Sequence, residues 1–205
     1  MENLSLNLDL NSYELLNKKI AAKISELSKG CGRLFDIGFG NCSLIEVISS
    51  SGRNCSYFGI DLESTTVELA RAYISKHNIA TLFSVEQVDI LKFTGKSFDC
   101  CVCSRLFHHF SLLEAKAVLK SMTEIIDMNG RLIIADSIRD YRNRSDRNSY
   151  TPYFFLNEIS ALIGSENVEI LPINDARLNL NQIWFLCVDI HAKMAKFSLH
   201  ILNEV

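Results

Sequence analysis

Carboxylates and glycines stand where apolar runs end in this sequence, in a pattern suited to a nucleotide-type cofactor. One apolar run ends in Asp36, and Gly38 and Gly40 follow two and four residues later. Glycine allows sharp turns and lets a ligand approach the backbone closely. A helical pattern begins near Leu44, so the glycines mark a strand-to-helix transition, where open α/β sheets bind ligands. We therefore interpret residues 34–42 as a cofactor-binding loop.

Two further carboxylates, Asp61 and Asp89, close the next two predicted strands. A carboxylate at a strand end can accept hydrogen bonds from both hydroxyls of a ribose, which a neutral side chain does less well. A structural alternative exists for each residue. Asp61 could instead favour the start of the following helix through the helix dipole, and Asp89 could be a solvated turn residue.

Two adjacent histidines, His108 and His109, follow the predicted strand 98–104 and are candidate catalytic residues. An imidazole of near-neutral pKa can remove a proton from a hydroxyl, a thiol or an acidic carbon. A histidine before a helix can also simply bond the backbone and hold the loop. The sequence leaves both interpretations open.

No metal site is predicted. Cys100 and Cys103 form a Cys-x-x-Cys sequence, but they lie in an apolar strand, where side chains alternate between the two sheet faces. No second pair of ligands lies at a suitable spacing.

The elements that would position these residues alternate between strand and helix, which indicates a mostly parallel sheet with helices on both faces. The last two predicted strands are joined without a helical pattern, so we expect them to be antiparallel. Capping boxes are predicted at Thr65 with Glu68 and at Ser111 with Glu114, and Asn129-Gly130 is expected to end the helix that Ser111 starts. The predicted strands are 34–37, 57–61, 82–89, 98–104, 131–136, 168–173 and 183–190, and the predicted helices begin near residues 16, 44, 65, 111 and 152.

Length and composition favour one domain. The 205 residues are 48% hydrophobic, and we divide them into an N-terminal helical segment (1–30), a cofactor-binding core (31–136) and a C-terminal helix with a strand hairpin (137–205). The net charge of −3 argues against general nucleic-acid binding. Seven cysteines, an odd number, fit a reducing compartment, and no apolar stretch approaches membrane-spanning length, so we expect a cytoplasmic protein.

The segment Asp36-Ile37-Gly38-Phe39-Gly40 resembles the first motif of class I S-adenosylmethionine-dependent methyltransferases. It departs from the family at Cys42, where a third small residue is usual. The resemblance implies a Rossmann-like three-layer sandwich with a mostly parallel seven-stranded sheet whose last strand is antiparallel. It also implies that S-adenosylmethionine is the cofactor.

The same resemblance implies roles for the residues around this motif. Asp61 would hold the ribose, Asp89 would accept a hydrogen bond from the adenine amino group, and Asp36 would orient the loop and the amino-acid end of the cofactor. Leu62 and Ile90 would lie beside the adenine. The segment Ser104 to Phe110 resembles the one that follows strand four in small-molecule methyltransferases, and we count Ser104 among the cofactor-binding residues.

A small-molecule acceptor is the substrate class that remains after exclusion. The segment after residue 103 lacks the Asn/Asp-Pro-Pro-aromatic sequence of many amino methyltransferases, and no Pro-Cys nucleophile occurs. The loop 137–150, the helix 152–163, the N-terminal helix, the turn 174–181 or a second subunit of a homodimer could complete the acceptor pocket.

Two other functions stay open at this point. A cofactor-binding but inactive subunit that stabilises or regulates a partner is suggested by Cys42 and by the lack of an assured base. A nicotinamide-dependent oxidoreductase fits less well, because Ser43 stands where a dinucleotide fingerprint has its third glycine.

Overall fold

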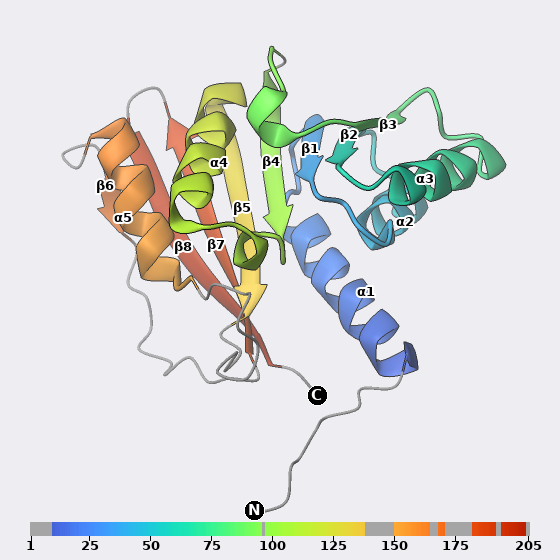
Figure 1. The fold of residues 1–205 in the computed structure, drawn as a ribbon, viewed down its shortest axis with the longest axis horizontal. Coiled ribbons are helices and arrows are strands. Elements are labelled where there is room, and N and C mark those ends of the chain that lie inside the picture. Colours follow the sequence, from blue (N-terminus) through green and yellow to red (C-terminus); the bar gives the residue numbers. More distant parts are fainter. Residues whose placement is uncertain are drawn as a thin grey trace, which may run out of the picture.

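One sheet of eight strands, in the order β3-β2-β1-β4-β5-β7-β8-β6, forms the centre of the protein (Figure 1). The computed structural model describes residues 10–95, 97–137, 150–164, 168–170, 182–191 and 194–203. The strands are β1 (Arg33–Ile37), β2 (Ser56–Asp61), β3 (Phe83–Gln87), β4 (Phe98–Ser104), β5 (Ile126–Ser137), β6 (Val168–Ile170), β7 (Gln182–His191) and β8 (Met194–Asn203). The helices are α1 (Leu10–Leu27), α2 (Ser43–Ser50), α3 (Ser64–Lys76), α4 (Leu112–Ile125) and α5 (Pro152–Ile163), with short 3-10 helices η1 (Ile90–Lys92) and η2 (Phe107–His109).

The predicted fold class is confirmed. Strands β1 to β5 pair in parallel, and β7 runs antiparallel to β5. The structure adds a strand that the sequence analysis did not anticipate, because β8 pairs with β7 along its whole length and brings the described sheet to eight strands.

The C-terminal hairpin was predicted between the wrong strands. Strands β7 and β8 form it, and β6 pairs in parallel with β8 instead of lying beside β7. Residues 171–173, the predicted end of the first strand, and residues 174–181, the predicted turn, lie outside the described residues. The alternation of apolar and polar residues along the sequence identifies strands, but it does not show which strands are neighbours in the sheet.

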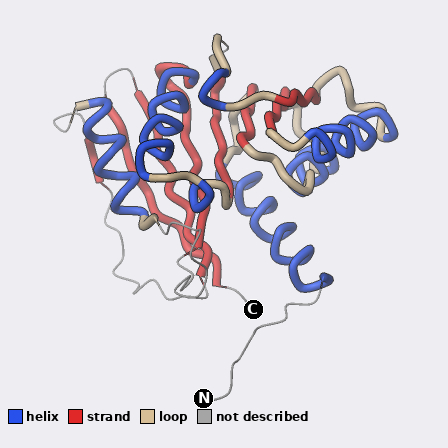
Figure 2. Tube along the Cα trace, in the orientation of Figure 1, coloured by secondary structure: helices blue, strands red, loops and turns tan. Residues whose placement is uncertain are grey.

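Helices cover both faces of the sheet and define two apolar cores (Figure 2). Helices α4 and α5 pack on one face, where Phe155 and Ile159 of α5 are fully buried. Helices α1, α2 and α3 pack on the other face. Cys100 and Cys103 contribute to opposite cores, as the alternation along β4 predicted.

The helix starts confirm one capping prediction and correct another. Ser111 and Glu114 form the predicted capping box of α4, with the Ser111 amide donating to Glu114 Oε2 over 2.8 Å. Helix α3 instead begins at Ser64 after Glu63, and neither Thr65 nor Glu68 caps it.

Helix α4 ends earlier than predicted. Its last residue is Ile125, and Asn129-Gly130 lies inside β5 rather than at the end of the helix. The apolar pattern continues past residue 125 because Ile126 pairs with Phe98 at the start of the β4–β5 ladder. Tertiary pairing here overrides the local stop signal.

Within the part of the chain that the structure describes, no helix combines the length and apolar character needed to cross a membrane.

Candidate functional site

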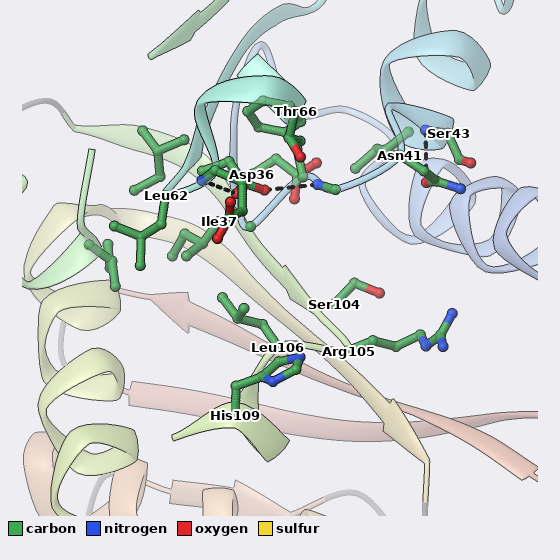
Figure 3. A pocket seen from close by; sticks show the side chains of 18 of the residues that line it. Asp36, Ile37, Asn41, Ser43, Leu62, Thr66, Ser104, Arg105, Leu106 and His109 are labelled. Carbon is green, nitrogen blue, oxygen red and sulfur yellow. Dashed lines mark hydrogen bonds between the residues drawn. The ribbon is translucent and has the colours of Figure 1, made fainter. Parts of the chain in front are cut away.

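A cavity of about 710 Å³ opens at the carboxyl ends of the parallel strands. Figure 3 shows side chains from the loops after β1 and β2 on one side, and those from the segment after β4 across from them. All ten residues proposed from the sequence line this cavity. They are Asp36, Gly38, Gly40, Asp61, Leu62, Asp89, Ile90, Ser104, His108 and His109.

The glycines of the loop are required by its backbone. Gly38 and Gly40 have φ angles of 68° and 54°, in the left-handed region that side chains disfavour. A Cβ atom on Gly38 would also come within 2.8 Å of Leu106 Cδ2. The Gly38 amide donates to the Ile60 carbonyl over 2.8 Å, which ties the loop to the end of β2.

The Asp61 carboxylate holds two backbone segments at the edge of the cavity. Its Oδ2 accepts from the Gly40 amide over 3.1 Å, and its Oδ1 accepts from the Glu63 amide over 3.0 Å. The structural alternative for Asp61 is therefore partly realised, since Glu63 directly precedes α3. An ionised carboxylate has about four acceptor sites, so these two bonds leave capacity for ligand hydroxyls.

Asp36 is a buried acid held by a phenol. Its side chain is 3% exposed, and the Tyr57 hydroxyl donates to Asp36 Oδ2 over 2.6 Å. Burial raises the pKa of Asp36 to about 7; the Tyr57 hydrogen bond opposes this rise, and the charge of Asp61 adds to it. Asp36 therefore changes its charge near neutral pH rather than near pH 4.

The residues expected beside an adenine differ in exposure. The Asp89 Oδ1 atom accepts from the Leu91 amide over 3.0 Å and so caps η1, which is close to the turn role considered as its alternative. Leu62 is 61% exposed, whereas Ile90 is buried. Both aliphatic side chains and Asp89 line the cavity, on the loops after β2 and β3.

The segment after β4 connects the sheet to α1. Arg105 has a φ of 55°, its amide donates to the Ala135 carbonyl over 2.7 Å, and its Nη1 donates to Asn17 Oδ1 over 2.6 Å. This contact joins residues 88 positions apart. Asn17 and three apolar residues of α1, namely Ile20, Ala21 and Ile24, line the cavity.

The two histidines occupy different environments. His108 is 6% exposed and its Nδ1 lies 3.5 Å from Asp136 Oδ1, whereas His109 is exposed. Asp136 is itself buried, near the end of β5. A carboxylate beside a ring nitrogen of a histidine can hold the imidazole in one orientation.

Sequence reasoning missed Asp136 and Asn17 as site residues. The signal for Asp136 was present, because β4 and β5 are neighbouring parallel strands whose carboxyl ends meet at one edge. No local signal marks Asn17, which reaches the site only through the packing of α1. Among the described residues, no α5 residue lines the cavity, although helix 152–163 was considered for the acceptor pocket.

Cys42, the departure from the expected motif, is absent from the lining of the cavity, although Asn41 and Ser43 on either side of it are present. It has a φ of 64° and immediately precedes α2. Burial, with contributions from Asp36 and Asp61, raises the pKa of its thiol to about 11. The presence of Cys42 in place of the usual small residue therefore alters the loop at a position that does not line the cavity.

Comparisons with known proteins agree with this geometry. Residues 34–130 match the methyltransferase domain family. The uncharacterized methyltransferase YcgJ of Bacillus subtilis (strain 168) is 25% identical over 105 residues, which is 51% of this chain. The chain spans 40% of the length of that relative.

Solved structures share the fold at low sequence identity. A magnesium protoporphyrin IX methyltransferase from Synechocystis PCC 6803, with bound SAH, has a TM-score of 0.62 and 15% identity over 88% of this chain and 84% of that one. An O-methyltransferase family protein from Burkholderia thailandensis has a TM-score of 0.61 and 14% identity over 94% of this chain and 56% of that one. The sheet and the glycine loop therefore resemble those of methyltransferases, and the family match covers residues 34–130, which contain that loop and strands β2 to β4.

Proposed function

We propose that this protein transfers a methyl group from S-adenosylmethionine to a small-molecule acceptor. One observation carries the proposal: the loop after β1, the carboxylates after β2 and β3, and the histidines after β4 all line the same cavity. Its volume of about 710 Å³ lies within the range of small-molecule and cofactor sites.

The residues that line the cavity suit S-adenosylmethionine. Gly38 and Gly40 expose backbone that a side chain would cover, so the amino-acid end of the cofactor can lie against the loop. Asp61 would accept from the ribose hydroxyls, Asp89 from the adenine amino group, and Leu62 and Ile90 would border the adenine. Ser104 lies at the end of β4, between these groups and the histidines.

The remaining groups would act on the acceptor. S-adenosylmethionine supplies a sulfonium methyl group that a nucleophile can take by direct displacement, so in-line positioning provides much of the rate. His108 would accept the proton that the acceptor loses, and Asp136 would hold the ring in place. His109 would contact the acceptor from the more exposed side of the segment.

The acceptor side of the cavity is bounded by α1 and by Phe110, with Arg105 anchored to Asn17 between them. This wall combines aliphatic, aromatic and cationic groups, which fits a partly apolar metabolite. The methylated atom, whether O, N, S or C, is left open. The loop 137–150, also considered for this pocket, lies outside the described residues except for its two ends.

Calorimetry with S-adenosylmethionine, its demethylated product and NAD tests the cofactor. We expect saturable binding of the first two and none of NAD. Binding of NAD alone would favour the oxidoreductase instead. A Cys42→Gly variant is the matched control for the motif, because it restores the usual small residue; a large gain in affinity would show that Cys42 weakens the site.

Turnover of methyl-labelled cofactor across pools of small metabolites tests the activity. Transfer of label by the pure protein would contradict the inactive-subunit alternative. Tight cofactor binding without transfer to any pool, and transfer only after a partner protein is added, would support that alternative. The single-domain division, the cytoplasmic location and a possible homodimer stay predictions.

A further inference from the structure

A fully buried tyrosine stands behind the acid of the glycine loop. Tyr57 lies on β2 and does not line the cavity, whereas Asp36 is among the lining residues drawn in Figure 3. The Tyr57 hydroxyl donates to Asp36 Oδ2 over 2.6 Å, and among the described residues no group donates to the second oxygen, Oδ1. One oxygen of Asp36 is therefore held by the protein, and the other is left for a ligand in the cavity.

Strand β2 has room for this contact because it carries a glycine there. Asp36 on β1 pairs with Gly59 on β2, and Tyr57 stands two residues before Gly59, on the same face of the strand. A Cβ atom on Gly59 would meet Phe39 Cδ1 at 2.8 Å, Tyr57 Cε1 at 3.0 Å and Tyr57 Oη at 3.1 Å. A glycine inside a strand often marks such a close approach. The phenol therefore uses the space that a side chain at position 59 would fill.

The Tyr57 ring is fixed by its own packing. It stacks on Phe83 of β3, with ring centroids 5.5 Å apart and an interplanar angle of 19°. Both rings belong to the apolar core beneath α1, α2 and α3. Because this packing does not depend on a ligand, the hydroxyl is pre-organised for Asp36 before any ligand binds.

The contact favours the ionised form of Asp36. Burial raises the pKa of Asp36 to about 7, the Tyr57 hydrogen bond acts against that rise, and the charge of Asp61 adds to it. Burial and the charge of Asp36 raise the pKa of Tyr57 well above its usual value, so the phenol stays a donor. The distance of 2.6 Å is typical of a hydroxyl that donates to an ionised carboxylate.

The thiols around Asp36 are uncharged near neutral pH. Cys42 precedes α2, and Cys101 and Cys103 lie on β4. Burial raises the pKa of Cys42 to about 11 and those of the two β4 thiols well above the usual value, and the charge of Asp36 contributes to each rise. The residues of α1 that line the cavity are also uncharged. Among these neighbours, the charge that acts on Asp36 is therefore that of Asp61.

We propose that Tyr57 is a positioning residue for the cofactor, whose hydroxyl keeps Asp36 ionised and oriented to receive the ammonium group of S-adenosylmethionine. This inference rests on the function proposed above. A cation binds an ionised carboxylate more tightly than a neutral one, so the ionised fraction of Asp36 sets the apparent affinity. Loss of the hydroxyl lowers that fraction at a given pH, and a higher pH restores it.

Calorimetry between pH 6 and pH 9 tests the proposal on wild type and Tyr57→Phe, which keeps the ring and removes only the hydroxyl. The probe is S-adenosylhomocysteine, the demethylated product, which carries the same ammonium group. We expect Tyr57→Phe to bind about tenfold or more weakly at pH 6 and within about twofold of wild type at pH 9. The ratio of the two Kd values at each pH cancels the titration of the probe itself. An equal loss at every pH, or no loss, would overturn the proposal.

Asp36→Asn is the matched control, because it keeps the shape of the side chain and cannot ionise. In that background, Tyr57→Phe should have no pH-dependent effect on the affinity for S-adenosylhomocysteine. A pH-dependent effect that persists without the carboxylate would contradict the proposal, since it would come from another group.

Urea unfolding gives a second readout that needs no cofactor. The difference in unfolding free energy between wild type and Asp36→Asn should fall as pH rises and level off above the folded-state pKa of Asp36. In the same pair carrying Tyr57→Phe, we expect it to level off about one pH unit or more higher. Gly59→Ala, whose Cβ would crowd the phenol, should give a smaller shift in the same direction.

The two readouts separate this inference from the function on which it rests. A protein that binds S-adenosylhomocysteine but levels off at the same pH with and without the hydroxyl would overturn the positioning role alone. A protein that shows the shift but binds neither S-adenosylmethionine nor its product would overturn the proposed function, and the positioning role with it.

Discussion

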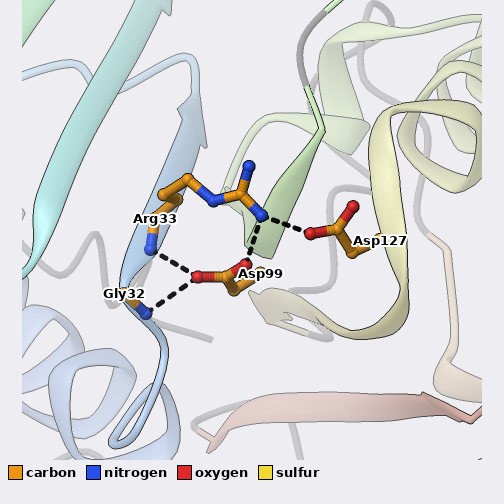
Figure 4. Close-up of polar contacts among 4 residues, drawn as sticks. All are labelled: Gly32, Arg33, Asp99 and Asp127. Carbon is orange, nitrogen blue, oxygen red and sulfur yellow. Dashed lines mark hydrogen bonds and ion pairs between the residues drawn. The ribbon is translucent and has the colours of Figure 1, made fainter.

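The two edges of the sheet hold their carboxylates in different ways. At the carboxyl edge, Asp36 is bound by a phenol and Asp61 by backbone amides. At the opposite edge, Asp99 and Asp127 are both bound by the Arg33 guanidinium, as Figure 4 shows. Arg131 binds Asp189 in the same region.

Neutral donors and cationic donors have different consequences for a carboxylate. A phenol or an amide fixes the position of the group without cancelling its charge, so the group can still interact with a ligand. A guanidinium fixes the position and cancels most of the charge. Burial raises the pKa of Asp99, but its hydrogen bonds with Arg33 lower it by more, so this acid stays ionised. Of these two edges, as far as the structure describes them, the carboxyl edge is therefore the better suited to a ligand that needs acceptors.

The largest effect is expected at His108. His108→Ala should lower turnover by about a hundredfold or more, because it removes the proposed base, and should leave cofactor affinity nearly unchanged. Asp136→Asn should give a smaller loss of turnover, and His109→Gln, which changes the exposed ring proposed to contact the acceptor, should also lower turnover by less than His108→Ala. The measurement is steady-state turnover with an acceptor from the metabolite screen. If neither histidine variant changes turnover, both side chains are structural.

The next effect concerns Asp36 and pH. Its folded-state pKa of about 7 lies above the ordinary aspartate pKa of 3.8, so the proton stabilises the folded state at low pH, and this contribution is lost as pH rises toward 7. The free energy of unfolding of wild type should fall relative to that of Asp36→Asn by about 2 to 3 kcal/mol between pH 5 and pH 8. Urea unfolding at both pH values measures this difference. Parallel pH profiles of the two proteins would show that Asp36 is not the titrating group.

A comparable effect is expected for cofactor binding at Asp61. Asp61→Ala should weaken S-adenosylmethionine binding by about 1 to 3 kcal/mol through loss of charge-assisted hydrogen bonds. Asp61→Asn is the matched variant, because it keeps one acceptor oxygen for the loop and loses the charge. Calorimetry measures both. Unchanged affinity in the Ala variant would leave Asp61 with only its observed role of holding the loop and the start of α3.

The smallest effect is expected at the opposite edge. Arg33 is half exposed, so Arg33→Met should lower the free energy of unfolding by about 1 kcal/mol or less and leave cofactor affinity unchanged. Urea unfolding and calorimetry on the same protein separate the two quantities. A loss of cofactor affinity in this variant would mean that the two edges are coupled. It would contradict the conclusion that their carboxylates have separate roles.

Local patterns predicted most of the parallel half of the fold. Strand β4 was predicted at its observed bounds, and the capping box of Ser111 and Glu114 is present as expected. The C-terminal half was predicted less well, because the hairpin pairing of β7 with β8 and the early end of α4 depend on contacts between distant segments. All ten proposed site residues meet at one cavity because strand ends in a parallel sheet share an edge.

The sequence by itself determined the glycine loop, the carboxylates that close the strands and the alternation that builds a parallel sheet. These features are local, since each depends on residue type and spacing along the chain. Only the tertiary structure decided that Asp136 lies beside His108 and that Asn17 of α1 reaches Arg105. Each of these contacts joins segments whose separation in sequence carries no signal, and the packing of helices and strands brings them together.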